Sequence, residues 1–536
     1  MSVFNGRYWP FFVFLITLIF CPALLAQTGA EIKTKDEVKS EAGTKKQSSM
    51  ETVEVKQSVS LGGKNLSYLV RAGEIPIFDK DGREAGRIFS TAYLTEVKDG
   101  RNSRPVTFMF NGGPGAASLY LHIGAFGPKY LPLKDQGLEV PRPPYKLADN
   151  PNTPLDVTDL VFVDPIGTGF SRAAGKVGEG DDKREIKPSD FWGVEKDLNS
   201  MAEFIRVWLT ENKRWGSPVF LAGESYGGLR VAGLTTALSD IGVAVSGVAL
   251  ISPALSYQDI IQTSDNFISQ IHIVPTFSAI AHYHGRLNPE LQALSVEEVS
   301  EQARQWAETD LLKALWQGNR LSEEDLKAVA EQMSRFIGIP QDELIHRRLR
   351  LLEYQFHDLL LKDRNLITGR YDGRATAPNP GGLHYYYGRG EDPSYTITQE
   401  SYQSALMDYF FTVLKLSTNN RYLNLNEEVI TGWQFNFDPY NGMLGFPGTV
   451  NQLAENMRRW PFLQVFLAMG RYDTATPPES ALAALSRLEV PRERLKTNIE
   501  THIYEGGHMM YTNSEAAGEL GVHFRTWLLK ALEERH

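Results

Sequence analysis

Cysteine is almost absent from this sequence, because Cys21 is the only one in 536 residues. If that residue leaves with an export signal, the remaining chain has neither a disulfide nor a thiol for catalysis. Positive charge is also in deficit, with a formal net charge of -10. Phosphate binding needs a basic face, so we expect no nucleic-acid partner.

Long hydrophobic runs are scarce as well. Arg7 precedes an apolar run that is broken by Pro10 and ends at Leu25, which is shorter than the ~20 residues of a membrane-spanning helix. The pattern predicts a signal peptide over residues 1–26 and an exported protein, periplasmic or secreted, with no membrane span after cleavage. An uncleaved membrane anchor is the alternative. Residues 27–56 are polar and predict a disordered linker.

The remaining composition is that of a soluble globular protein with a large core, with 42% hydrophobic, 11% aromatic and 22% charged residues. Apolar, strand-like runs alternate with helix-compatible segments, which is typical of a mostly parallel α/β sheet. An antiparallel pair of strands, 66–70 and 87–94, enters the sheet. The expected central strands are 105–110, 160–165, 219–222, 248–253, 463–470 and 497–504.

The strand pattern stops after about residue 258. Capping boxes at Ser295 and Ser322 predict helices. We therefore expect a mainly helical cap insertion over 258–430 that covers the active-site end of the sheet, between a first sheet part, 57–257, and a second, 431–536. His282 and His284 in the insertion lack carboxylate or cysteine neighbours, so we assign no metal.

A buried strand runs directly into the motif G-E-S-Y-G, in which Ser225 is the candidate nucleophile. In a nucleophile elbow the strand reverses sharply into a helix, so small residues such as Gly223 and Gly227 must flank the serine. The turn would leave the backbone N–H of Tyr226 at a helix N-terminus, aimed where an oxyanion forms. The motif alone also occurs as an ordinary glycine turn.

A serine hydroxyl needs an imidazole to accept its proton and a carboxylate to fix the tautomer of that imidazole. Asp473 and His508 each follow a predicted strand, and the chain order Ser225, Asp473, His508 is that of the α/β-hydrolases. We take these three residues as the candidate triad. Taken singly, Asp473 could equally be a helix cap and His508 a structural histidine.

Residues 111–115 read N-G-G-P-G directly after a predicted strand. Glycines let backbone amides approach a ligand closely, as an oxyanion hole requires, although a tight turn would use the same residues. The segment resembles a block of the serine carboxypeptidase family, as do D-P-I-G-T-G-F-S at 164–171, G-E-S-Y-G-G at 223–228 and G-H-M at 507–509. The chain resembles a bacterial-type member that lacks cysteine after cleavage.

The resemblance implies an α/β-hydrolase fold and removal of residues from the C-termini of peptides, without a cofactor. It also implies that Gly113 and Tyr226 donate the oxyanion hydrogen bonds. Asn111, Gly112 and Glu224 would then bind the terminal carboxylate of the peptide substrate. A protonated Glu224 could donate a hydrogen bond to that carboxylate, whereas an ionised one would repel it.

The chain departs from the family pattern near this carboxylate site. Met109 stands where the family usually has tryptophan, and Ala125 stands where many members carry a second glutamate; Ala116 and Arg471 also differ. Two other functions therefore stay open. One is an esterase or acyltransferase with the same triad, and the other is a non-catalytic binding protein on a hydrolase scaffold.

Overall fold

The computed structural model describes residues 50–96, 104–178, 183–263, 265–379, 392–435 and 445–533. All of them lie in the unit Ser49–His536. The expected signal peptide, 1–26, and residues 27–49 of the expected linker lie outside the described residues.

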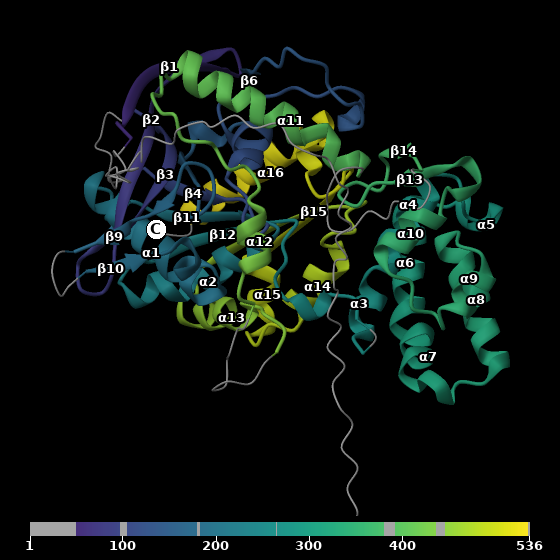
Figure 1. Ribbon diagram of the computed structural model, residues 1–536. Helices are drawn as coiled ribbons and strands as arrows, with labels where there is room; N and C mark the ends of the chain where they lie inside the picture. The colour runs from purple at the N-terminus through teal and green to yellow at the C-terminus, as the bar shows by residue number, and fades with distance from the viewer. Residues whose placement is uncertain are drawn as a thin grey trace, which may run out of the picture. The chain divides into compact units, whose positions relative to one another are not determined.

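A ten-stranded sheet crosses this unit (Figure 1). Its strand order is β1-β2-β3-β7-β4-β11-β12-β15-β16, and β8 pairs with β3. The strands from β7 to β16 pair in parallel, whereas β1, β2 and β3 pair antiparallel. The prediction of a mostly parallel sheet with antiparallel N-terminal strands is confirmed. The sheet strands are β1 Val53–Leu61, β2 Lys64–Phe78, β3 Glu84–Thr95, β4 Val106–Phe110, β7 Asp159–Val163, β8 Arg172–Ala173, β11 Val219–Glu224, β12 Val245–Ile251, β15 Gln464–Gly470 and β16 Ile499–Tyr504.

Both faces of the central strands are buried, because helices cover each face. Successive side chains of a strand point to opposite faces, so Phe108 joins one core cluster and Met109 the other. Helices α1, α2, α13, α14 and α15 pack on the Phe108 side, and α11 and α16 pack on the Met109 side. Their bounds are α1 Val194–Glu211, α2 Tyr226–Asp240, α11 Pro393–Asp408, α13 Val450–Arg459, α14 Pro478–Ser486, α15 Arg492–Asn498 and α16 Ser514–Glu533.

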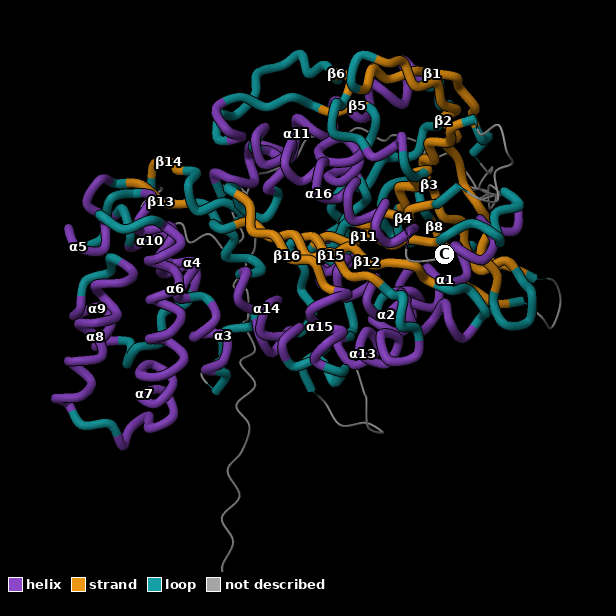
Figure 2. Tube along the Cα trace, turned by 180° about the vertical axis from the view of Figure 1, so that it is seen from behind, coloured by secondary structure: helices purple, strands orange, loops and turns teal. Residues whose placement is uncertain are grey.

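A group of helices between β12 and β15 lies beside the sheet, next to β15 and β16 (Figure 2). The capping boxes place two of them correctly, since Ser295 and Ser322 accept hydrogen bonds from backbone N–H groups of the following turn. The group comprises α3 Phe267–His272, α4 Val274–Tyr283, α5 Pro289–Gln292, α6 Val296–Trp306, α7 Leu312–Gln317, α8 Glu323–Ile337, α9 Gln341–His346 and α10 Glu353–Leu359.

The expected insertion 258–430 is not one packing unit. The helical group has its own core between Ile271 and Leu361, joined by Tyr472. Helix α11, by contrast, packs Tyr402 and Leu406 into the core of the sheet. The sequence pattern cannot distinguish these cases, because an amphipathic helix has the same periodicity whichever core it covers.

The expected linker 27–56 is wrong at its C-terminal end, because β1 begins at Val53. This edge strand pairs with β2 along its whole length. Its residues alternate between half-buried and exposed, so Lys56 and other polar side chains occupy the exposed face. The exposed half of the residues in such a strand is polar, so its composition resembles that of a linker.

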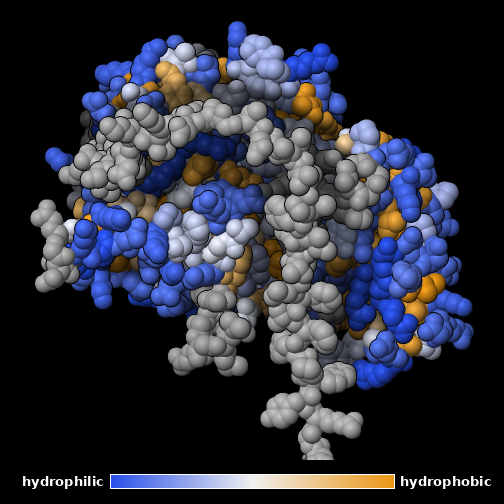
Figure 3. Space-filling view, in the orientation of Figure 1, coloured by the Kyte–Doolittle hydropathy of each residue, from blue (hydrophilic) through white to orange (hydrophobic). Residues whose placement is uncertain are grey.

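Smaller elements connect the larger ones. They include β5 Lys129–Tyr130, β6 Ala148–Asp149, β9 Gly175–Val177, β10 Arg184–Ile186, β13 Leu366–Thr368, β14 Thr376–Pro378, α12 Glu427–Gly432 and the π-helical turn η2 Leu121–Phe126. In the described part of the chain, no helix combines the length and apolar character needed to cross a bilayer. On the face seen in Figure 3, hydrophilic residues prevail over the helical group and hydrophobic ones are interspersed among them.

Candidate active site

The turn at Ser225 is as sharp as the motif requires. β11 ends at Glu224 and α2 begins at Tyr226, so Ser225 alone joins them, with φ 60° and ψ -125°. A residue with a side chain adopts such a backbone only where the surrounding structure forces it. A Cβ on Gly223 would lie 2.0 Å from the carbonyl oxygen of Gly227, so this position excludes any side chain.

The glycine loop that follows β4 lies against this turn. A Cβ on Gly112 would come within 2.5 Å of the backbone nitrogen of Tyr226 and 2.9 Å of Ser225 Cβ. Gly113 and Gly115 both have a φ of 98°, which favours glycine. The structure therefore brings residues 112–113 beside the N-terminal amide of α2, where backbone N–H groups can face a developing oxyanion.

Asp473 and His508 meet at the ends of β15 and β16. Nδ1 of His508 lies 2.7 Å from Oδ2 of Asp473, and both side chains are buried. The other carboxylate oxygen accepts hydrogen bonds from the backbone N–H groups of Ala475, at 2.8 Å, and Thr476, at 3.0 Å. These bonds fix the carboxylate, which in turn places the ring proton on Nδ1 and leaves Nε2 as an acceptor.

Ser225 and His508 flank the same short segment after β12. The backbone of Ser225 bonds to Ile251 and Ala254, and the carbonyl oxygen of His508 accepts a hydrogen bond of 2.8 Å from Ser252 Oγ. Among the hydrogen bonds of the described residues, none joins Ser225 Oγ to His508. Such a bond often tightens only in the substrate complex.

Burial by itself lowers the pKa of His508. The charge of Asp473, its hydrogen bond and the charge of Glu224 outweigh that effect, so the pKa of His508 is raised above its usual value. His508 must be neutral to accept a proton from a serine. Activity through this histidine is therefore present above its pKa and is lost as the pH falls through it.

Glu224 is a buried carboxyl group next to the serine. Its Oε2 accepts hydrogen bonds from Asn111 Nδ2, at 2.7 Å, and from the hydroxyl of Tyr511, at 2.8 Å. Burial raises the pKa of Glu224 to about 7, although His508 and the two hydrogen bonds lower it. The structure thus brings Asn111 and Glu224 together beside Ser225, and it adds Tyr511, which the sequence motifs do not include.

Arg230 holds in place the glycine loop that follows β4. Its Nη1 donates to the carbonyl oxygen of Asn111 at 2.7 Å, and its Nε donates to Asp197 at 2.7 Å. Both partners of this ion pair are buried, so the charges compensate each other away from water. Sequence reasoning missed Arg230, although a charged residue in the otherwise apolar start of α2 is a signal for a buried contact.

A loop at residues 370–371 contacts His508 and Thr474, the residue that follows Asp473. The carbonyl oxygen of Tyr371 accepts a hydrogen bond from the backbone N–H of His508, and the two rings are 5.4 Å apart. The carbonyl oxygen of Arg370 accepts a hydrogen bond of 2.8 Å from Thr474 Oγ1, next to the aspartate. The loop follows the helical group in the chain, so this group is linked to the candidate triad.

His357 of α10 completes that link. Its Nε2 lies 2.8 Å from Thr474 Oγ1 and its Nδ1 lies 2.7 Å from Thr368 Oγ1. Since the Thr474 hydroxyl already donates to Arg370, it must accept from Nε2–H, and Nδ1 then accepts from Thr368. Burial lowers the pKa of His357 to about 3, so it stays neutral. No sequence motif identifies this residue.

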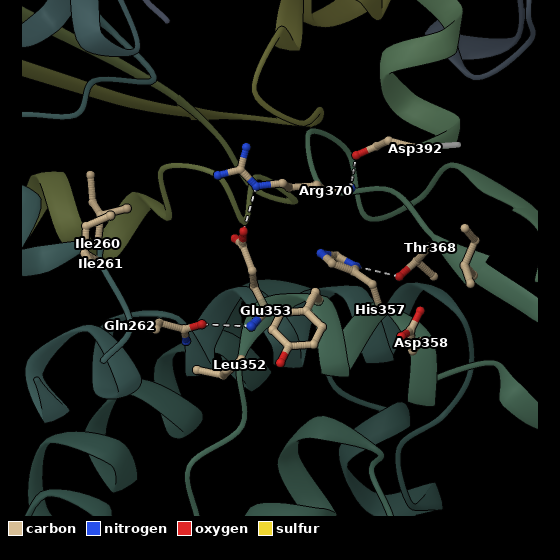
Figure 4. A pocket seen from close by; sticks show the side chains of 12 residues that line it. Ile260, Ile261, Gln262, Leu352, Glu353, His357, Asp358, Thr368, Arg370 and Asp392 are labelled. Atoms are coloured by element: carbon tan, nitrogen blue, oxygen red, sulfur yellow. Dashed lines mark hydrogen bonds and ion pairs between the residues drawn. The ribbon is translucent and has the colours of Figure 1, made fainter. Parts of the chain in front are cut away.

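A cavity of about 140 Å³ lies beside this network (Figure 4). On one side, Arg370 Nε donates to Glu353 Oε1 at 2.7 Å, and the backbone N–H of Glu353 donates to Gln262. The lining residues are Ile260, Ile261, Gln262, Leu352, Glu353, Tyr354, His357, Asp358, Ile367, Thr368, Arg370 and Asp392. The Arg370–Glu353 ion pair and several aliphatic side chains line the cavity. Arg370 directly precedes Tyr371, whose ring contacts His508.

His282 and His284 serve structural contacts. Nε2 of His282 lies 3.0 Å from the carbonyl oxygen of Leu294, and Nε2 of His284 lies 2.8 Å from that of Gly373. Within the described ranges, no three histidine, cysteine, aspartate or glutamate side chains are grouped so that they could hold a metal ion.

Comparison with known proteins agrees with this geometry. The serine carboxypeptidase family profile matches residues 92–335. This part of the chain is therefore similar to the serine carboxypeptidase family. Serine carboxypeptidase-like 42 from Arabidopsis thaliana is 30% identical over 185 residues, which cover 32% of this chain and 34% of that protein. The pheromone-processing carboxypeptidase KEX1 from Saccharomyces cerevisiae is 28% identical over 165 residues, which cover 30% of this chain and 21% of that protein.

These matches span only about a third or less of the two relatives. The fold similarity extends further. A crystal structure of a prohormone-processing carboxypeptidase from Saccharomyces cerevisiae aligns with a TM-score of 0.52 at 13% identity, over 86% of this chain and 92% of that one. The serine carboxypeptidase profile includes Asn111, Glu224 and Ser225 but ends before Asp473 and His508, so these two residues enter the site through the fold alone.

Proposed function

We propose that the protein is a serine-type carboxypeptidase that removes residues from peptides with a free C-terminus. The observation that carries the proposal is the buried carboxyl of Glu224, held by Asn111 directly beside Ser225. A hydrolase that acts on ordinary esters has no need for a carboxyl group with a raised pKa next to its nucleophile. A substrate carboxylate needs such a donor, because a second ionised carboxylate would repel it.

In this proposal Ser225 attacks the carbonyl carbon of the last peptide bond. His508 takes the serine proton and later gives it to the leaving amine, while Asp473 stabilises the ring in its cationic form. The backbone N–H groups of Gly113 and Tyr226 bind the oxyanion. Water then hydrolyses the acyl-enzyme by the same route. Catalysis by these side chains requires no cofactor.

Asn111, Gly112 and Glu224 bind the terminal carboxylate in this scheme. The pKa of Glu224 is raised to about 7, so the group is protonated and can donate below that pH and is ionised above it. Activity on free-acid peptides is therefore present below about pH 7 and falls as the pH rises through it. Substrates whose C-terminus is amidated do not depend on this proton.

We expect Glu224→Gln to abolish the alkaline fall of kcat/KM on free-acid peptides, because the amide donates at every pH. The fall on the acid side should also move to lower pH, because the charge of Glu224 raises the pKa of His508. The measurement is kcat/KM from about pH 5 to about pH 9 on a blocked dipeptide and on its C-terminal amide.

A wild-type pH profile in Glu224→Gln on the free acid would contradict the role of Glu224. Equal kcat/KM for the free acid and the amide in the wild-type protein would contradict the carboxypeptidase proposal itself. Glu203→Gln in α1 is a matched control, since Glu203 pairs with Arg206 on the surface of that helix.

An esterase or acyltransferase that uses the same triad is the second candidate. Met109 favours it, because this buried thioether supplies no hydrogen-bond donor where the family usually has an indole. A strong preference for amides or esters over the free acid would select this candidate.

We further infer that the protein is exported, on the basis of the basic and apolar pattern of residues 1–26. We also propose that the helical segment within 258–430 shapes access to the site, since its loop at Arg370 contacts the strand end that carries Asp473.

A further inference from the structure

One oxygen of Glu224 carries both of the side-chain hydrogen bonds to this group. Asn111 Nδ2 lies 2.7 Å from Oε2, and the hydroxyl of Tyr511 lies 2.8 Å from the same atom. An amide nitrogen can only donate here, and the single proton of the phenol points to Glu224. A carboxyl oxygen has two lone pairs, so both lone pairs of Oε2 are occupied.

The other oxygen, Oε1, is the one left for a ligand. It has no hydrogen-bond partner among the described residues. A proton that binds to Glu224 must therefore go to Oε1.

The turn η2 positions both donors. The backbone N–H of Leu121 donates to Asn111 Oδ1 at 3.0 Å, which turns the amide nitrogen toward Glu224. A Cβ on Gly124 would lie 2.7 Å from Cε2 of Tyr511 and 2.9 Å from Cε2 of Tyr402. Glycine at 124 therefore makes room for the Tyr511 ring, one residue before Ala125.

We propose that Tyr511 is a specificity-determining residue, whose hydroxyl acts with Asn111 to fix the proton of Glu224 on Oε1 for donation to a substrate carboxylate. This inference rests on the proposed carboxypeptidase function. Many family members carry a second glutamate where this chain has Ala125. The phenol supplies a hydrogen bond to Glu224 without a second titrating carboxyl group.

Other groups around Glu224 also shift its pKa. Burial raises the pKa of Glu224, His508 lowers it, and Asp473 raises it slightly. Burial raises the pKa of Tyr402, and the charge of Glu224 raises it further. Burial raises the pKa of Tyr511 well above its usual value, so the phenol stays a donor throughout the working range. The hydrogen bond from Tyr511 favours the ionised form of Glu224 and so sets the upper pH limit of activity.

We expect Tyr511→Phe to move the alkaline fall of kcat/KM on a free-acid dipeptide to higher pH by about one unit, because the ionised form of Glu224 loses a charge-assisted hydrogen bond. The profile on the amidated dipeptide should not move. Tyr68→Phe is the matched control, since it removes a buried hydroxyl that bonds Gln57, far from the site.

Site-specific 3-fluorotyrosine at position 511 tests the same bond in the opposite direction. Its more acidic phenol has nearly the same shape and is a stronger donor, so the alkaline fall should move to lower pH. An infrared titration of the Glu224 carboxyl, identified by its loss in Glu224→Gln, follows the same shifts without turnover.

Opposite shifts in the two variants, seen both in kinetics and in the infrared titration, support the proposal. An unchanged Glu224 titration in both variants overturns it. If Tyr511→Phe does not fold, the 3-fluorotyrosine variant decides alone. Failure of the carboxypeptidase proposal would appear separately, as a wild-type protein with no preference for the free acid, and the infrared titration would still decide the role of Tyr511.

Discussion

Replacing Ser225 with alanine should lower kcat/KM on a blocked dipeptide by about 10⁴-fold or more, because no other group can form the acyl-enzyme. In the proposed mechanism, the strained backbone at Ser225 presents this hydroxyl to the substrate. Alanine keeps the small size that the turn accepts, so the fold should persist. The measurement is steady-state kinetics together with the thermal unfolding midpoint.

Ser239→Ala is the control for this loss, since Ser239 lies in the last turn of the same helix, α2. It should retain wild-type kinetics. Removal of a triad nucleophile lowers kcat/KM by several orders of magnitude. If Ser225→Ala retains more than about a tenth of the wild-type kcat/KM, Ser225 is not the nucleophile.

The second large effect concerns Asp473. Asp473→Asn should lower kcat/KM by about 10³- to 10⁴-fold, because an amide nitrogen facing Nδ1 favours the wrong tautomer of His508. The asparagine oxygen can still accept the backbone hydrogen bonds from Ala475 and Thr476, so the loop should keep its shape.

The pH profile gives this variant a second readout. The charge of Asp473 raises the pKa of His508, so its removal should move the acid-side fall of kcat/KM to lower pH. Asp240→Asn, at the exposed end of α2, is the matched control. A near-normal rate in Asp473→Asn, or an acid-side fall that stays in place, would remove Asp473 from the mechanism.

The parts of the site that local motifs encode could be predicted. Ser225 lies between a buried strand and a helix, and Asp473 and His508 each follow a strand that ends at the same edge of a parallel sheet. Parallel strands bring their carboxyl ends together, so the sequence order alone predicts that these side chains converge.

The supporting contacts could not be predicted, because each joins residues far apart in the chain through a single side chain. Arg230 reaches the carbonyl oxygen of Asn111, and His357 reaches Thr474. Tyr511 looks like an ordinary core aromatic until the structure places its hydroxyl on Glu224. Such contacts depend on tertiary packing and leave no periodic pattern in the sequence.

For a related reason, sequence analysis could not predict that the segment 258–430 divides between two hydrophobic cores. Helix α11 packs into the sheet and α10 packs into the helical group, yet both have apolar residues at helical spacing. The start of β1 was missed because only one face of that edge strand is apolar.

Labelling with a fluorophosphonate probe, followed by peptide mapping, tests the central claim most directly. The probe reacts with a serine only where a base and an oxyanion hole activate it. We expect one label, on Ser225, at a rate that drops sharply in Asp473→Asn. A protein that stays unlabelled, or a label on a different residue, would contradict the assignment of this site and favour a binding protein on a hydrolase scaffold.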